Sequence, residues 1–109
     1  MRDLKPIVVA LRGDEKYQRL LSNVSDTVGM KSGYVVLKPN ESIGEHNTEA
    51  KEEAIIILKG KAEVYIAGSP LFCVDENNLI YIPPQTVHDI KNISRGDLRY
   101  VYVVSIIKD

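Results

Sequence analysis

The chain has 109 residues, of which 44% are hydrophobic and 27% are charged, and this length fits one domain with its own core rather than two domains. The 14 Lys and Arg nearly balance the 15 Asp and Glu, so the sequence lacks the basic excess that is typical of nucleic-acid binding. No apolar run reaches the about 18 residues that a membrane-spanning helix needs, and we expect neither nucleic acid nor a membrane as a partner.

The single cysteine favours a cytoplasmic protein. Cys73 has no second cysteine with which to form a disulfide inside the chain, and a reducing compartment is the natural place for such a protein. The apolar stretch near the N-terminus is followed at once by acidic residues and lacks a small-residue cleavage site. We therefore interpret it as mature sequence and not as a signal peptide.

Short apolar runs, divided by turn residues, follow one another along the chain. The first run, 7–12, predicts a strand, whereas 17–24 is compatible with a strand or with a short helix. The runs at 53–58 and 62–68 are divided by Gly60, which predicts a hairpin because glycine tolerates positive φ. Five further strands are expected at 32–39, 71–75, 79–83, 87–93 and 98–107.

This pattern of about eight short strands with closely spaced turns predicts an all-β sandwich or barrel. A closed or double-sheet jelly roll is favoured over an open sheet, because an open sheet leaves unpaired edges. We expect one domain over 1–109, in which 1–30 form an N-terminal strand or strands with a connecting segment and 31–109 form the barrel.

The chain has only two histidines, and both lie next to predicted strands. His88 shares a strand face with Ile90, which predicts that its side chain points inward. Glu53 shares a face with Ile55, but the other face of that run is equally apolar, so alternation leaves open which face is inside. If Glu53 points inward, its carboxylate needs an ion pair, a hydrogen bond or a metal ion.

Two segments resemble the paired signature motifs of the cupin superfamily, whose members are small jelly-roll barrels built around a metal ion. In the first segment Glu53 is followed by six residues and Gly60, as in the family, and His46 takes the place of the first histidine. Thr48 stands where the family has its second histidine. In the second segment, "PPQTVHDIKN", the proline, His88 and the asparagine have the family's spacing. The resemblance covers roughly 33–107 and implies a cupin-type double-stranded β-helix.

The resemblance implies a metal site of His46, Glu53 and His88, with Glu49 as an alternative fourth ligand. Two imidazoles and one carboxylate suit Fe(II), and Mn, Ni, Co or Zn would accept the same donors. Without the motifs, His46 and Glu53 would be interpreted as solvated side chains. Three further polar residues of the two motifs are assigned to the pocket: Thr48, Gln85 and Asn92. Of these, Asn92 is interpreted as a structural hydrogen-bonding residue rather than a ligand.

The same resemblance implies a metal-binding protein that acts on a small polar organic molecule, as a dioxygenase, an isomerase or a decarboxylase, without selecting among them. Two alternatives stay open. The barrel either binds a small ligand such as a sugar or a carboxylate without turnover, or is degenerate and holds no metal. The resemblance also implies a homodimer, for which the apolar N-terminal segment "KPIVVAL" is long enough to exchange between subunits; otherwise it completes its own sheet.

Overall fold

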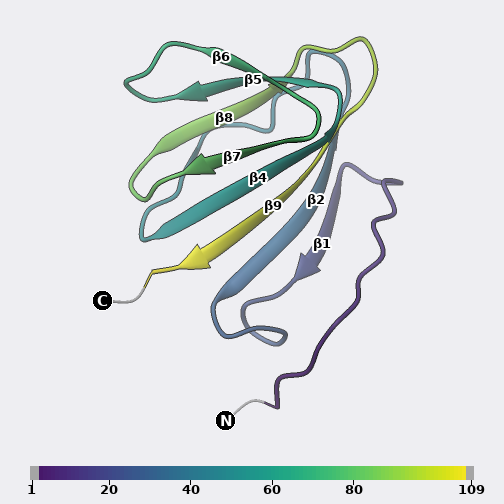
Figure 1. Cartoon of the computed structure of the whole chain (residues 1–109), viewed down its shortest axis with the longest axis vertical. Coiled ribbons are helices and arrows are strands. Elements are labelled where there is room, and N and C mark those ends of the chain that lie inside the picture. Colours follow the sequence, from purple (N-terminus) through teal and green to yellow (C-terminus); the bar gives the residue numbers. More distant parts are fainter. Residues whose placement is uncertain (1–2, 108–109) are drawn as a thin grey trace.

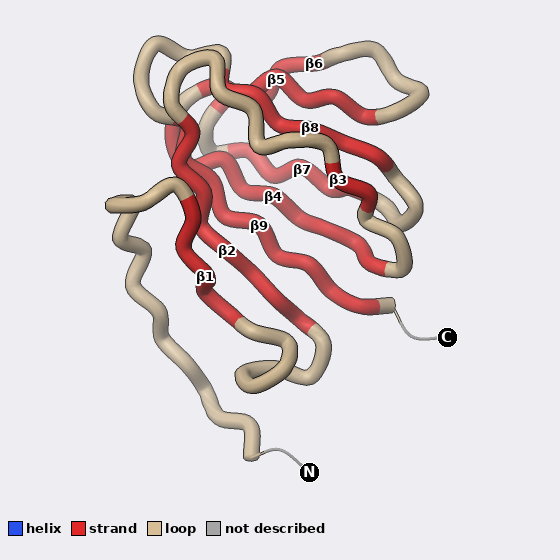
Figure 2. Tube along the Cα trace, turned by 180° about the vertical axis from the view of Figure 1, so that it is seen from behind, coloured by secondary structure: helices blue, strands red, loops and turns tan. Residues whose placement is uncertain are grey.

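Residues 3–107 are described by the computed structural model, and they form nine strands in two antiparallel sheets that face each other (Figures 1 and 2). The strands are β1 (Tyr17–Leu21), β2 (Met30–Leu37), β3 (His46–Asn47), β4 (Lys51–Lys59), β5 (Lys61–Ile66), β6 (Phe72–Asp75), β7 (Asn78–Ile82), β8 (Val87–Asn92) and β9 (Leu98–Ile106). The larger sheet has the order β1-β2-β9-β4-β7, and the smaller has the order β3-β8-β5-β6. The all-β, double-sheet jelly roll expected from the strand spacing is confirmed.

The N-terminal segment departs from the expected pattern, because 7–12 form no strand. The segment instead runs as an extended coil beside β1 (Figure 1). Gln18 of β1 fixes it there: its side-chain amide donates to the Ala10 carbonyl at 2.8 Å and accepts from the Arg12 backbone N–H at 2.9 Å. One side chain thus replaces a ladder of backbone hydrogen bonds. The 17–24 run is a strand only over its first five residues.

Within 3–107, no helix is long and apolar enough to cross a membrane.

The hairpin predicted at Gly60 is wrong. β4 pairs with β7 and β9, whereas β5 pairs with β6 and β8, so the chain passes from one sheet to the other at this glycine. Gly60 has φ of +92°, and a Cβ there would lie 2.8 Å from Ser94 Oγ and 2.9 Å from the Asp97 carbonyl oxygen. Both the backbone conformation and the crowding therefore require glycine at this corner.

Burial of β4 settles which of its two apolar faces is inside. Ile55 and Ile57 are 1% and 0% exposed, whereas Ile56 and Leu58 are 37% and 39% exposed. Because side chains alternate along a strand, Glu53 points inward with the buried pair.

The inner faces of two strands of the larger sheet, β2 and β4, change from apolar to charged side chains toward the same end. From the packed end outward, β2 presents Leu37, Val35 and then Lys31, and β4 presents Ile55, Glu53 and then Lys51. β9 lies between them and presents Tyr100 and Tyr102 before Val104. One end of the barrel is therefore filled with hydrocarbon, and the end where β2 and β4 begin, which we call the open end, is lined with polar groups.

We predict that Gly60→Ala destabilises the fold more than Gly68→Ala. Gly68 also has positive φ, +84°, but nothing lies within 4 Å of a Cβ added there. Gly68→Ala should cost only the left-handed conformation, about 1–2 kcal/mol, and Gly60→Ala should cost an additional about 1–3 kcal/mol of overpacking. Urea denaturation followed by circular dichroism measures both, and equal losses would show that the crowding at Gly60 is not real.

Candidate functional site

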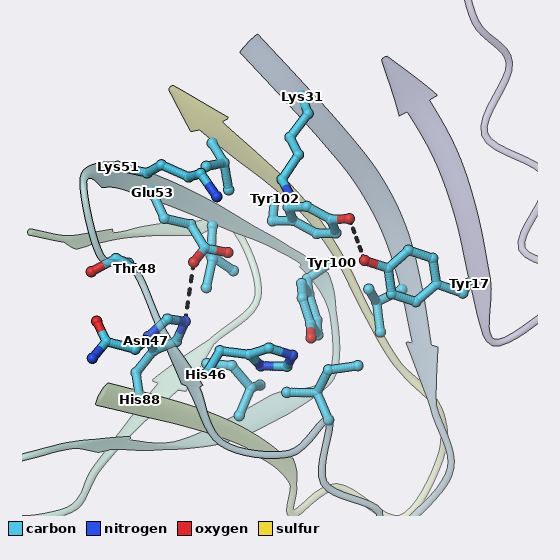
Figure 3. A pocket seen from close by; sticks show the side chains of 15 residues that line it. Tyr17, Lys31, His46, Asn47, Thr48, Lys51, Glu53, His88, Tyr100 and Tyr102 are labelled. Carbon is cyan, nitrogen blue, oxygen red and sulfur yellow. Dashed lines mark hydrogen bonds and ion pairs between the residues drawn. The ribbon is translucent and has the colours of Figure 1, made fainter. Parts of the chain in front are cut away.

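A cavity of about 160 Å³ lies between the two sheets toward the open end. Side chains from β1, β2, β3, β4, β8 and β9 line it (Figure 3). Its apolar part is formed by core side chains at the packed end, which are Val35, Ile43, Ile55, Ile90 and Tyr100. Its polar part includes both histidines of the chain and Glu53, so the structure brings together at one cavity the three residues that the sequence assigns to a metal site.

His88 and Glu53 meet across the cavity from opposite sheets. His88 Nε2 lies 3.0 Å from Glu53 Oε1, and the two side chains are only 6% and 13% exposed. His88 Nδ1 lies 3.2 Å from the Thr86 carbonyl oxygen, which can only accept a hydrogen bond. Nδ1 therefore carries a proton, and Nε2 of a neutral ring would turn a lone pair toward a carboxylate. Two electron-rich atoms at this distance need a positive species between them, either a second proton or a metal ion.

The proton affinity of His88 reflects this arrangement. Burial by itself lowers the pKa of His88. The hydrogen bond to Glu53, the hydrogen bond to the Thr86 carbonyl and the charges of Glu53 and Asp89 together outweigh burial, so the pKa of His88 is raised above its ordinary value of 6.5. The site thus favours a positive charge at Nε2.

His46 faces the same cavity from the strand beside His88. The two histidines are directly opposite each other in the β3–β8 pair, with ring centroids 6.2 Å apart. His46 is exposed, and its ring makes no hydrogen bond with any residue within 3–107. Unlike His88, it is therefore free to take up a ligand without giving up a partner inside the chain.

Thr48 has a structural role at the position where the family carries its second histidine. Its hydroxyl donates to the Pro83 carbonyl at 2.7 Å and accepts from the Thr86 backbone N–H at 3.0 Å. It is 6% exposed and lines the cavity. These bonds fasten the turn after His46 to the segment before His88, so Thr48 holds the two histidine-bearing strands together.

Three other residues assigned to the site from sequence lie outside the cavity lining. Glu49 is exposed in the turn after β3, and its carbonyl accepts the Gln85 backbone N–H at 2.9 Å. Both have positive φ, 55°, because they occupy tight turns. Asn92 is completely buried, donates to the carbonyls of Leu37 and Gly96 and accepts from Ser94. Glu49 is therefore not placed as a fourth ligand, and Asn92 closes the packed end of the barrel.

Sequence reasoning did not assign several further cavity residues to the site, among them Tyr17, Lys31, Lys51 and Tyr102. The hydroxyls of Tyr17 and Tyr102 hydrogen-bond to each other, and burial, with that hydrogen bond, raises the pKa of Tyr102. The ring of Tyr102 lies directly over Gly33, where a Cβ would approach it to 2.6 Å. Alternation along β4 could have found Lys51, which is two residues before Glu53 and therefore on the same face.

The donor chemistry of the cavity suits a divalent metal ion, although within 3–107 no three His, Cys, Asp or Glu side chains stand grouped as a ready metal site. Two imidazoles and a carboxylate are common ligands of first-row divalent metals. His88 Nε2 and Glu53 Oε1 lie 3.0 Å apart, so these two donors would hold one ion together. His46 supplies the third donor at the same cavity.

Comparison with known proteins finds one matching family model and two relatives of similar sequence. The sequence model of the family described as "Cupin domain" matches residues 33–104. The polyketide synthase CurC of Streptomyces cyaneus is 29% identical over 82 residues, which are 72% of this chain and 53% of that protein. Auxin-binding protein 1 of Arabidopsis thaliana is 32% identical over 62 residues, 50% of this chain and 31% of that protein. The matches thus span about half or less of these relatives.

A solved structure supports the same fold. An RmlC-like cupin family protein with a double-stranded β-helix fold, from Methanocaldococcus jannaschii, superposes with a TM-score of 0.76 and 22% identity. The match covers 93% of this chain and 90% of that one.

We predict that Glu53→Gln lowers the pKa of His88 in chelator-treated protein, because it removes the carboxylate that faces Nε2. Glu52→Gln is the matched control, since Glu52 points away and accepts a hydrogen bond from the Tyr81 hydroxyl at 2.6 Å. NMR titration of the imidazole C–H signals measures the change, and the two histidines make assignment simple. An unchanged pKa in Glu53→Gln would contradict the ion pair.

The same pair should make stability depend on pH. The raised pKa of His88 means that its stabilising contribution is fully present below the ordinary pKa of 6.5 and is lost as the pH rises through the folded-state value. Denaturation of chelator-treated protein across this range should show the loss in wild type and less of it in Glu53→Gln.

Proposed function

Because the chain belongs to the cupin family, we propose that its cavity binds a small polar organic molecule beside a divalent metal ion held by His46, Glu53 and His88. The observation that carries the proposal is the meeting of these three side chains, from β3, β4 and β8, at one cavity between the sheets. A bound divalent ion supplies a Lewis acid that polarises a carbonyl or hydroxyl oxygen of its neighbour.

The surrounding residues prepare the site for this role. The Thr86 carbonyl holds the His88 ring so that Nε2 faces the cavity, as is usual for ligand histidines whose other nitrogen is hydrogen-bonded. The carboxylate of Glu53, only 13% exposed, brings negative charge to a place where water screens it little. Thr48 keeps the strand of His46 against the strand of His88.

The shape of the cavity limits what it can take. Its volume of about 160 Å³ is below the about 300–1,000 Å³ of pockets that enclose drug-sized ligands. The walls at the packed end are hydrocarbon, and the polar groups lie toward the open end. A small molecule with an apolar body and one or two polar groups fits this division. One relative, auxin-binding protein 1, has a binding function in its name, which agrees with a ligand pocket.

A second candidate is a pocket that binds its ligand without a metal ion. The direct contact of His88 Nε2 with Glu53 Oε1 at 3.0 Å favours it, because a proton alone can join the two groups. In that case the imidazolium and the exposed ring of His46 would offer hydrogen bonds to a ligand. The two candidates make opposite predictions for metal content.

We predict that the purified protein binds about one equivalent of a divalent metal and that His46→Ala weakens this binding by about tenfold or more. His46→Ala is the most informative variant because the His46 side chain is exposed, so removing it leaves the core intact. His88→Ala and Glu53→Ala should weaken metal binding further, because each removes a buried ligand and leaves the other member of the pair without its contact. Elemental analysis and calorimetric titration with Mn(II), Co(II) and Zn(II) measure the effect.

Glu49→Ala is the matched control for these variants. Glu49 belongs to the same motif and carries the same kind of donor as Glu53, but lies outside the cavity lining. It should leave metal affinity unchanged. A loss in Glu49→Ala as large as in Glu53→Ala would contradict the assignment, and wild-type protein that binds none of the three ions would favour the metal-free pocket.

A further inference from the structure

We propose that the molecule bound in this cavity is a small organic acid whose carboxylate is held by Lys31 and Lys51 at the open end of the barrel. The inference rests on the proposal that the cavity is a ligand site, and it adds the chemical class of the ligand. Nothing in the two signature motifs points to these lysines, since Lys31 precedes the first motif and Lys51 is one of its variable positions.

The sheet register places the two lysines on opposite sides of the cavity. Lys31 of β2 is directly opposite Val104 of β9, and Val104 is directly opposite Glu53 of β4. Lys51 is two residues before Glu53 and therefore shares its inward face. Figure 3 shows the side chains of both lysines extending toward the cavity, one from each side, above Tyr102 and Glu53.

The charges of these two lysines are not balanced within the described part of the chain. Neither forms an ion pair there, whereas four other lysines do: Lys5 with Asp3, Lys16 with Glu41, Lys38 with Asp97 and Lys61 with Asp75. Glu53 is the one carboxylate among the described residues that line the cavity, and it is engaged by His88. Two unpaired ammonium groups at one rim create a positive potential that attracts an anion.

The rest of the lining favours a carboxylic acid over an inorganic anion. The hydroxyls of Tyr17 and Tyr102 lie beside Lys31 and hydrogen-bond to each other, so the hydroxyl that accepts this bond keeps its own O–H to donate to a carboxylate oxygen. Below them Ile55 and Tyr100 give the apolar surface that a hydrocarbon body needs and that inorganic phosphate cannot use. A ligand with its carboxylate at the rim extends its body toward the histidines.

The test compares acids with uncharged amides of the same shape. Propionate with propionamide, and benzoate with benzamide, are titrated into chelator-treated protein at constant ionic strength and near neutral pH, with ¹H–¹⁵N NMR as the readout. We expect at least one of the two acids to shift cavity resonances and to bind about tenfold or more tightly than its amide. Lys31→Met and Lys51→Met should each weaken that acid by about tenfold and leave the amide unchanged.

Lys59→Met is the matched control, because Lys59 is exposed on the same strand as Lys51 but lies outside the cavity lining. Equal affinity for acid and amide, an equal loss in Lys59→Met, or no cavity shift with either acid would overturn the inference. Lysine-dependent binding of inorganic phosphate without binding of either acid would also overturn it.

Metal content separates this inference from the proposed function. The lysine variants should keep the metal stoichiometry of wild type, because neither side chain is among the proposed ligands. Protein that binds no metal but still prefers an acid through Lys31 and Lys51 refutes the metal site and supports the acid. Protein that holds metal on His46 and His88 but does not distinguish acid from amide refutes the acid alone.

Discussion

The contact between His88 and Glu53 determines which charges the interior of the barrel can hold. It joins the two sheets across the cavity, with Nε2 and Oε1 3.0 Å apart and both side chains almost out of water. With Nδ1 committed to the Thr86 carbonyl, the contact is favourable only when a positive species lies between the ring and the carboxylate. A positive charge, carried by a proton on Nε2 or by a bound metal ion, would therefore join the two sheets at this contact.

The fold allows this charged contact inside the barrel because one end of the barrel is filled with hydrocarbon and the other end is polar. The inner faces of β2 and β4 change together from core side chains to Lys31, Glu53 and Lys51. Completely buried residues such as Ile57 and Asn92 close the packed end. The charged residues can then be grouped near the open end, where water and a ligand reach them, without disturbing the core.

Sequence patterns predicted the fold class and the inward direction of one of the two residues in the His88–Glu53 contact. The alternation around His88 gave its inward direction because only one face of that strand is apolar. The same reasoning could not orient Glu53, since β4 is apolar on both faces, and only burial in the structure decided it. Gly60 was misjudged because a local turn signal does not say whether consecutive strands belong to one sheet. Lys31 and Lys51 were missed because a lysine at a strand end is ordinarily a solvated side chain.

Titration with a paramagnetic ion distinguishes a metal ion from a proton between His88 and Glu53. Co(II) added to the full chain should broaden the imidazole signals of both His46 and His88 together, and saturate at about one equivalent, if the cation held between His88 and Glu53 is a metal ion. Broadening that leaves the His88 signals sharp, or that centres on residues outside the cavity, would contradict the account and leave a proton as the charge that joins the two sheets.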